Sequence, residues 1–173
     1  NVRPDIKVCA DAKDFIDAFM ANADKIRKKD RKSWFEYCDR LKAKYPIVRR
    51  EYYDEKNAVN TYCLLDVISD TLTPNDIYVS GSSGSCIVKK GQRVFCTKGL
   101  ASMGYGFPSA IGACLAGGRR RTVGVNGDGG FMMNIQELET LRRLDLPVKI
   151  FVLCNGGYGA IKATQTNVFA AHY

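Results

Sequence analysis

The chain has 173 residues, of which 46% are hydrophobic and 25% are charged, and its formal net charge is +8. This length and apolar content are enough for one domain core, or for a core with an appendage. No apolar run approaches the roughly 20 residues that a membrane-spanning helix needs, so we expect no membrane partner. The sequence begins with Asn1 and lacks the apolar segment of a signal peptide, which leads us to expect the middle of a longer chain.

Seven cysteines are spread along the chain, at positions 9, 38, 63, 86, 96, 114 and 154. Their odd number and the absence of CxxC spacing argue against a disulfide framework or a zinc site. Most of them lie in apolar or helical surroundings, and the single histidine, His172, cannot form a metal cluster by itself. We therefore expect reduced, buried thiols in a cytoplasmic protein.

Much of the net charge is concentrated in one run, since six of the eight residues from 25 to 32 are Lys or Arg. Such a run is typical of nucleic-acid-binding proteins, which stay one hypothesis for the function. However, the run contains no interleaved aromatic residues, and Asp24 and Asp30 lie at its edges. We interpret it as a solvated surface and expect no nucleic-acid partner.

Two helices are predicted in the first part of the chain. Asp11 is placed to cap the first helix. The apolar side chains that this helix is expected to turn inward are Phe15, Ile16, Phe19 and Met20. Ser33 and Glu36 form the pattern of a capping box, which predicts a second helix that ends before Pro46.

Residues 47–57 are polar and predicted to be irregular, and Asn60 is expected to cap a third helix that continues to Leu72. Four strands are then predicted, at 77–80, 93–96, 122–125 and 148–153. Helices are predicted between them at 107–115 and 131–144. This alternation indicates an α/β fold, a doubly wound parallel sheet with helices on both faces, preceded by a helical linker. We expect the first, third and fourth strands to be parallel neighbours.

The most informative segment is Gly127-Asp128-Gly129-Gly130, which lies between a buried strand and a helix. A glycine-rich turn of this kind points free backbone N–H groups at an anion. Asn155 follows the next strand, 27 positions after Asp128. In an open parallel sheet, the carboxyl ends of the strands form one crevice. A carboxylate from one turn and an amide oxygen from the next could then hold a hard cation that bridges two phosphates.

The segment from Gly127 to Ile161 resembles the signature of thiamine diphosphate-dependent enzymes, and within them the branch of acetolactate synthases and 2-oxo-acid decarboxylases. Beyond the spacing of Asp128 and Asn155, the resemblance includes the sequence Gln-Glu-Leu-Glu-Thr in the helix, Leu-Pro-Val-Lys before the strand, and a Tyr after the glycines. One departure is Cys154, where the family has the first of two paired asparagines. The metal ligand of the family is the second, which Asn155 matches.

The resemblance implies a set of site residues. Magnesium would be bound by the side chains of Asp128 and Asn155 and by the carbonyl of Gly157. Met103 matches the bulky residue that forces thiamine diphosphate into a V shape, and the carbonyl of Ala101 matches the acceptor for the cofactor's 4′-amino group; these two are the implied catalytic residues. The residues implied to bind the cofactor are Ser82, Ser83, Ala101, Met103, Gly127, Gly129, Gly130, Tyr158, Gly159, Ala160 and Ile161. From the residues alone, Met103 would be ordinary core packing.

The resemblance also implies how the chain is organised. Residues 58–173 would form the diphosphate-binding domain, truncated at its C-terminus, and residues 1–57 would be the end of a central domain and a helical linker. In the family, a separate pyrimidine-binding domain, usually from another subunit, carries the glutamate that activates the cofactor. We therefore expect a homodimer or homotetramer, and no activity from this chain alone. Whether FAD binds in other domains stays open.

The implied function is carbon–carbon bond chemistry on a 2-oxo acid, by a transferase or lyase similar to acetolactate synthase. Ile161 stands where aldehyde-releasing decarboxylases carry a glutamate, which favours carboligation. Thr164 stands where acetohydroxyacid synthases carry a tryptophan in the second-substrate pocket, which indicates a specialised substrate range. Two alternatives remain, a 2-oxo-acid decarboxylase of the same family and a non-catalytic nucleotide-binding module, although no GxGxxG motif follows a strand here.

Overall fold

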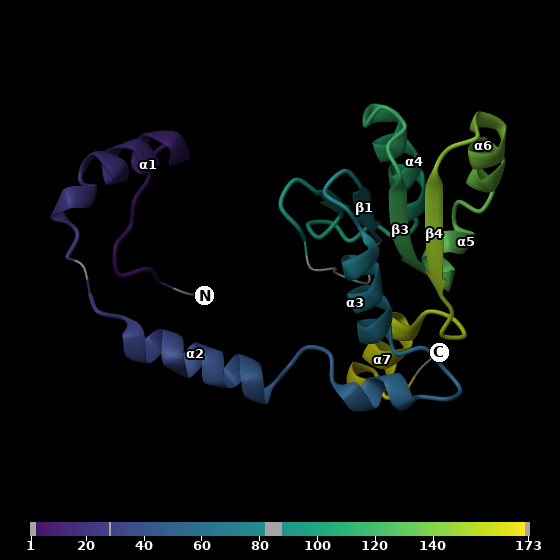
Figure 1. Cartoon of the computed structure of the whole chain (residues 1–173), viewed down its shortest axis with the longest axis horizontal. Coiled ribbons are helices and arrows are strands. Elements are labelled where there is room, and N and C mark those ends of the chain that lie inside the picture. Colours follow the sequence, from purple (N-terminus) through teal and green to yellow (C-terminus); the bar gives the residue numbers. More distant parts are fainter. Residues whose placement is uncertain (1–2, 28, 82–87, 172–173) are drawn as a thin grey trace. The chain divides into compact units, whose positions relative to one another are not determined.

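The computed structural model describes residues 3–27, 29–81 and 88–171. The chain forms two compact units, Asn1–Pro46 and Ile47–Tyr173. The second unit contains a parallel β-sheet with helices packed around it (Figure 1). The domain boundary that the sequence suggested stays a prediction.

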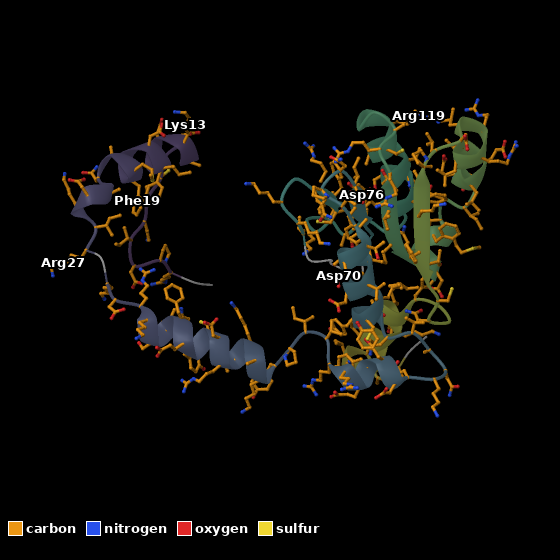
Figure 2. The ribbon with its side chains drawn as sticks, in the orientation of Figure 1. Lys13, Phe19, Arg27, Asp70, Asp76 and Arg119 are labelled. Carbon is orange, nitrogen blue, oxygen red and sulfur yellow. The ribbon has the colours of Figure 1, made fainter. Side chains whose placement is uncertain are left out.

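The first unit is helical in its described part, with α1 (Ala12–Ala21), η1 (Ala23–Lys25) and α2 (Lys32–Lys44). Asp11 caps α1 as predicted, since its Oδ1 accepts a hydrogen bond from the N–H of Lys13 at 2.8 Å. The expected inward packing of the apolar stripe is wrong, because these side chains, including Phe19 (Figure 2), are 47–64% exposed. A short helix needs a second layer to cover its apolar face, and this unit buries no residue of α1 or α2.

The start of α2 differs from the predicted capping box. The helix begins at Lys32, so Ser33 lies inside it rather than at its cap. Arg31 occupies the N-cap position and makes no side-chain capping hydrogen bond. Asp30, just before the cap, satisfies one free N–H group of the helix start, since its Oδ1 accepts a hydrogen bond from the N–H of Lys32 at 2.9 Å. The end of the helix at Lys44, before Pro46, is as predicted.

The second unit begins with η2 (Arg50–Asp54), where an irregular chain was expected. It continues with α3 (Thr61–Thr71), whose predicted cap is confirmed because the N–H of Tyr62 donates to Oδ1 of Asn60 at 3.0 Å. The helix ends at Thr71, and the N–H of Leu72 still donates to the carbonyl of Ile68. This helix leads directly into the sheet.

One parallel sheet contains the strands β1 (Ile77–Ser80), β2 (Arg93–Cys96), β3 (Thr122–Gly127) and β4 (Val148–Leu153). Their order across the sheet is β2-β1-β3-β4. Ile77 pairs with Thr122, and Thr122 pairs with Val148, so the predicted parallel neighbours are confirmed. All of β1 and nearly all of β3 are buried, as central strands covered on both faces must be. The carboxyl ends of β3 and β4 consequently meet at one edge.

Helices cover both faces of the sheet, which confirms the predicted α/β architecture. One apolar cluster joins α3 to the sheet and consists of Leu65, Ile68, Leu72, Tyr78, Val123 and Val125. The other joins α4 (Gly106–Ala116) to the sheet and contains Ile77, Val79, Ala110, Cys114 and Val148. Neighbouring residues of β1 thus belong to different clusters, as the two-residue period of a strand requires. Gly124 leaves room for the neighbouring strand's side chain and for α4, because a Cβ there would lie 2.7 Å from Cδ1 of Ile150 on β4 and 3.5 Å from Cβ of Ala110 on α4.

The single helix predicted over 131–144 is wrong in its extent. The structure has two helices there, α5 (Asp128–Met132) and α6 (Glu137–Leu144). Between them, the side-chain amide of Asn134 donates a hydrogen bond to the carbonyl of Gly104 at 2.8 Å. The helix is therefore interrupted at Asn134, whose side chain binds a loop that is distant in sequence. This tertiary contact outweighs the local helix propensity.

The six cysteines in the described ranges are free thiols. Cys63 and Cys114 are buried, whereas Cys9, Cys96 and Cys154 are exposed, so the expectation of buried thiols is wrong for these three. Cys96 lies on β2, an edge strand of the sheet, and Cys154 lies in the turn after β4. Among the residues described, no helix combines the length and apolar character that crossing a membrane requires.

Candidate functional site

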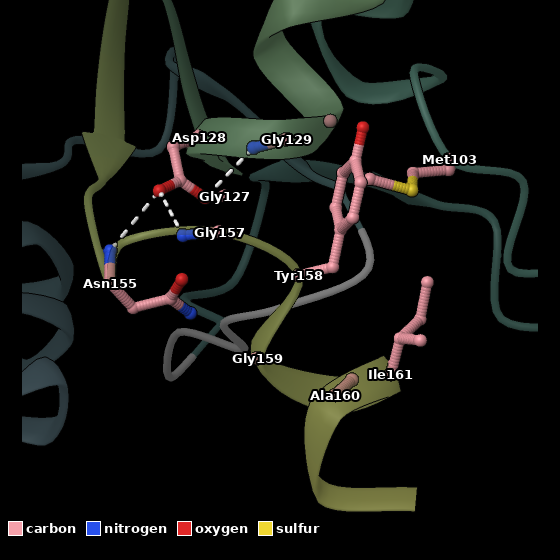
Figure 3. Close-up of a pocket in the computed structure, with 11 residues that line it drawn as sticks. Met103, Gly127, Asp128, Gly129, Asn155, Gly157, Tyr158, Gly159, Ala160 and Ile161 are labelled. Carbon is pink, nitrogen blue, oxygen red and sulfur yellow. Dashed lines mark hydrogen bonds between the residues drawn. The ribbon is translucent and has the colours of Figure 1, made fainter. Parts of the chain in front are cut away.

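Asp128 directly follows β3, and Asn155 follows β4 with one residue between. Both lie at the carboxyl edge of the sheet, where open α/β sheets bind ligands. The Asp128 carboxylate faces the turn after β4 (Figure 3), and its Oδ2 accepts hydrogen bonds from the N–H of Gly157 at 3.1 Å and of Asn155 at 3.3 Å. Its Oδ1 accepts the N–H of Gly129 at 2.8 Å. A single carboxylate thus ties the two turns together.

These hydrogen bonds determine the charge of the site. The N–H of Gly129 lowers the pKa of Asp128 below its ordinary value, and the N–H groups of Gly157, Asn155 and Gly156 act in the same direction. Partial loss of solvation opposes this effect and raises the pKa. The net direction is downward, so the Asp128 carboxylate is ionised at neutral pH and offers a negative charge to a cation.

The turn after β4 depends on its glycines. Gly156 has φ +77° and Gly157 has φ +130°, which are conformations that residues with a side chain rarely adopt. Gly159 begins α7 (Gly159–Val168), and a Cβ at that position would lie 2.8 Å from Nδ2 of Asn155. The glycines therefore let the chain reverse tightly between Asn155 and α7, and this reversal brings the backbone N–H groups to Asp128.

A cavity of about 110 Å³ lies against this edge. It is lined by Met103, Gly127, Asp128, Gly129, Gly130, Asn155, Gly157, Tyr158, Gly159, Ala160 and Ile161. Each of these residues belongs to the set that the family resemblance implied, so the structure brings most of that set together. Their individual roles stay predictions.

Tyr158 and Met103 meet over the first helical turn after β3 (Figure 3). A Cβ at Gly129 would lie 2.3 Å from Cε1 of Tyr158 and 2.8 Å from Cε of Met103. Both side chains remain partly exposed, Met103 by 38% and Tyr158 by 49%. Gly129 thus provides the space in which these two side chains reach the site, and the role of Met103 stays a prediction.

One residue of the implied set lies outside the cavity lining. Ala101 does not line the cavity; it has φ +51°, and its N–H donates to the carbonyl of Thr97 at 2.6 Å. The loop that carries Ala101 and Met103 is held in place by the hydrogen bond from Asn134 to Gly104. Ser82 and Ser83 fall outside the described residues.

Two asparagines near the site were not recognised from the sequence. Asn134 anchors the Met103 loop, and the one signal for it is a polar residue within an apolar helical segment. Asn126, the second-last residue of β3, is 3% exposed, and a Cβ at Gly106 or Gly81 would lie 2.0 Å or 2.5 Å from its Oδ1. Within the described part of the chain, its Nδ2 has no hydrogen-bond partner. The sequence signal for Asn126 is a polar residue at the end of an apolar strand, where a buried amide needs a hydrogen-bond partner.

The donor atoms at this edge suit a hard cation together with a phosphate ligand. They include the ionised carboxylate of Asp128, the exposed side-chain amide of Asn155 and the carbonyl of Gly157, and such oxygens are the ligands that magnesium and calcium take. A Cβ at Gly127 or Gly156 would meet no atom within 4 Å, which leaves open space beside these donors. The residues present therefore fit a metal-bound diphosphate.

Comparison with known proteins also points to a diphosphate-binding site. Residues 81–173 match the family "Thiamine pyrophosphate enzyme, C-terminal TPP binding domain". Acetolactate synthase 2, chloroplastic, from Zea mays is 28% identical over 183 residues, which cover 99% of this chain and 28% of the maize protein. A probable acetolactate synthase large subunit from Methanocaldococcus jannaschii is 31% identical over 176 residues, or 95% of this chain and 30% of that protein.

The acetolactate synthase isozyme 2 large subunit from Escherichia coli is 32% identical over 148 residues, which cover 81% of this chain and 26% of the bacterial protein. The chain spans less than a third of the length of each of these relatives. The family match extends over more than half of the chain and contains every residue that lines the cavity. The chain therefore belongs to the thiamine pyrophosphate enzymes and carries their C-terminal TPP binding domain.

Proposed function

We propose that this chain is the diphosphate-binding part of a larger enzyme that uses thiamine diphosphate and magnesium to make or break a carbon–carbon bond of a 2-oxo acid. The observation that supports this most strongly is the meeting of Asp128 and the Asn155–Gly157 turn at one sheet edge, inside the segment that matches the family. The relatives named acetolactate synthase support the reaction class.

In this proposal, the metal is held by oxygens of Asp128, Asn155 and Gly157. Magnesium is usually bound by one or two carboxylates together with phosphates of the ligand, so one ionised carboxylate at this site is sufficient. The ten-residue helix α7 begins beside the turn, and the partial positive charge of its N-terminus would favour the phosphates. The chain would thus bind the charged end of the cofactor.

When bound, the thiazolium ring of thiamine diphosphate supplies the carbanion chemistry that protein side chains lack. The contribution of this chain is geometry. Met103 would support the bend of the cofactor, and the carbonyl of Ala101 would accept a hydrogen bond from its 4′-amino group. The left-handed backbone of Ala101 supports this role, since strained conformations of non-glycine residues concentrate at ligand sites.

The small size of the cavity supports the participation of another domain. Its volume of about 110 Å³ is well below the roughly 300–1,000 Å³ of typical ligand pockets. We propose that a pyrimidine-binding domain of the same enzyme, contributed by another subunit of a homodimer or homotetramer, completes the site and provides the activating glutamate.

The free thiols of the described cysteines suit a reducing compartment, and we propose that the protein lies in the cytoplasm.

The side chain of Ile161 supports carboligation over simple decarboxylation. It lines the cavity and presents an apolar group where aldehyde-releasing relatives of the family carry an acid. Without an acid at this position, protonation that ends the reaction as an aldehyde is disfavoured, which leaves time for a second carbonyl substrate to react. An acetolactate synthase-like enzyme of specialised substrate range is therefore our first choice, and a 2-oxo-acid decarboxylase is the second.

Calorimetry of the full-length protein tests the proposal. We expect thiamine diphosphate to bind in the presence of magnesium and to bind much more weakly in its absence. NAD and an oligonucleotide serve as controls for a nucleotide-binding module and for the basic run at 25–32, and neither should bind at the same site. Binding of NAD in competition with thiamine diphosphate, or no binding of thiamine diphosphate with magnesium, would contradict the proposed function.

A further inference from the structure

Lys162 lies beside the turn that contains two of the proposed metal ligands, although no motif marks it as a site residue. It belongs to the first turn of α7, and its Nζ donates a hydrogen bond to the carbonyl of Gly156 at 3.3 Å. A Cβ at Gly157 would lie 3.4 Å from the same nitrogen. The structure thus places an ammonium group against the backbone that follows Asn155.

The charges of the cavity favour a cation at this place. Among the described residues that line the cavity, Asp128 alone has an acidic or basic side chain. A diphosphate would add further negative charge, which a single divalent cation offsets only in part. In a partly enclosed site these charges repel one another more strongly than in water. A nearby ammonium group would reduce this repulsion and attract the phosphates.

Lys162 has the freedom to provide that group. Its side chain is exposed, and one hydrogen bond of 3.3 Å to a carbonyl is a weak attachment. Lysine has a flexible stem and three N–H donors, so the ammonium can keep the carbonyl of Gly156 and still donate to a second acceptor. Space beside the turn is open, because a Cβ at Gly156 would meet no atom within 4 Å.

We propose that Lys162 is a further diphosphate-binding residue, whose ammonium group donates to the terminal phosphate of the cofactor across the Gly156-Gly157 turn. This inference rests on the proposed function and extends it by one residue. The site would then hold the phosphates from two sides, by the metal on Asp128 and Asn155 and by the ammonium of Lys162.

The test compares thiamine diphosphate with thiamine monophosphate by calorimetry, using the full-length protein at a fixed magnesium concentration. Lys162→Met removes the charge and keeps much of the length of the side chain, and Lys162→Arg keeps the charge. Lys149→Met is the matched control, because this exposed lysine of β4 lies six residues before Asn155, about 20 Å along an extended strand. Both Met variants change the net charge equally.

We expect Lys162→Met to weaken binding of thiamine diphosphate about tenfold and to leave thiamine monophosphate unaffected, since the lost hydrogen bond is to the terminal phosphate. Lys162→Arg should retain most of the affinity, and Lys149→Met all of it. An equal effect of Lys162→Met on both ligands, or no effect on either, would overturn the inference. If the wild-type protein itself does not bind thiamine diphosphate, the proposed function fails instead, which is a distinct result.

Discussion

The N–H of Gly157 lies 3.1 Å from Oδ2 of Asp128, so the turn after β4 is hydrogen-bonded to the residue that follows β3. Gly157 reaches this position with φ +130°, in a region of backbone conformation that is essentially limited to glycine. This hydrogen bond directly connects two of the proposed metal ligands, Asp128 and Gly157. The geometry of the site is therefore set by a backbone conformation as well as by side chains.

We expect Gly157→Ala to destabilise this turn by about 1–3 kcal/mol, because alanine has to adopt a strained backbone conformation. The N–H of residue 157 would then shift away from Asp128, and magnesium-dependent binding of thiamine diphosphate should weaken together with stability. Urea unfolding and calorimetry measure the two effects. Gly118→Ala is the control, since Gly118 also has positive φ (+71°), meets no atom within 4 Å of its Cβ position and lies at the end of α4. It should lower stability alone.

A second prediction concerns acid stability. Asp76, labelled in Figure 2, is a buried residue, and the guanidinium of Arg121 donates to it from Nε at 2.7 Å and again from Nη2, which lowers the pKa of Asp76 to about 2. The N–H and hydroxyl of Thr73 add hydrogen bonds at 2.6 Å and 3.0 Å. Because this pKa is lower in the folded than in the unfolded protein, the ionised carboxylate stabilises the fold above about pH 4, and this contribution is lost as the pH falls toward about 2.

Asp76→Asn removes this dependence. With Arg121 half exposed to solvent, we expect the pair to contribute about 1–2 kcal/mol at neutral pH. Urea unfolding at about pH 6 should therefore show the variant to be less stable than the wild type, and the difference should shrink at about pH 3. A difference that stays constant between the two pH values would mean that the ionised pair is not its source.

Met103 connects the fold to the proposed reaction. It lies over Gly129 together with Tyr158, at the place where the bend of the cofactor would be supported. Met103→Ala should lower turnover of the complete enzyme more than it weakens cofactor affinity, because the diphosphate site stays intact while the reactive geometry loosens; positioning of this kind is worth several kcal/mol. Met103→Leu, which is similar in volume, should be tolerated far better. An alanine variant with normal turnover and reduced thermal stability would identify Met103 as a packing residue.

The strands, and the parallel pairing of β1, β3 and β4, were predictable because their signals are local or topological. β1, β3 and β4 are short apolar runs bounded by turn residues, and right-handed crossovers make such runs parallel neighbours. Once β3 and β4 are adjacent, Asp128 and Asn155 necessarily meet at their carboxyl edge. The positions of Asp128 and Asn155 after these two strands were therefore enough to predict where the site lies.

The parts that were missed depend on contacts between distant segments. Nothing near Asn134 in sequence indicates that its amide binds Gly104, so the division of one predicted helix into α5 and α6 was not foreseeable. Lys162 is recognised only when α7 is placed beside the Gly156 carbonyl. At the start of α2, the helix begins one residue before Ser33, and the first N–H group is taken by Asp30, which the capping-box pattern did not indicate.

The central claim is that Asp128 holds the magnesium ion that binds the diphosphate. The most direct measurement is calorimetric binding of thiamine diphosphate to the full-length protein, with and without magnesium, for the wild type and for Asp128→Ala, with thermal unfolding to verify that the variant is folded. We predict that magnesium strongly increases the affinity of the wild type and has no effect on the variant, which lacks the one ionised carboxylate of the cavity. Undiminished, magnesium-dependent binding by folded Asp128→Ala would contradict the claim.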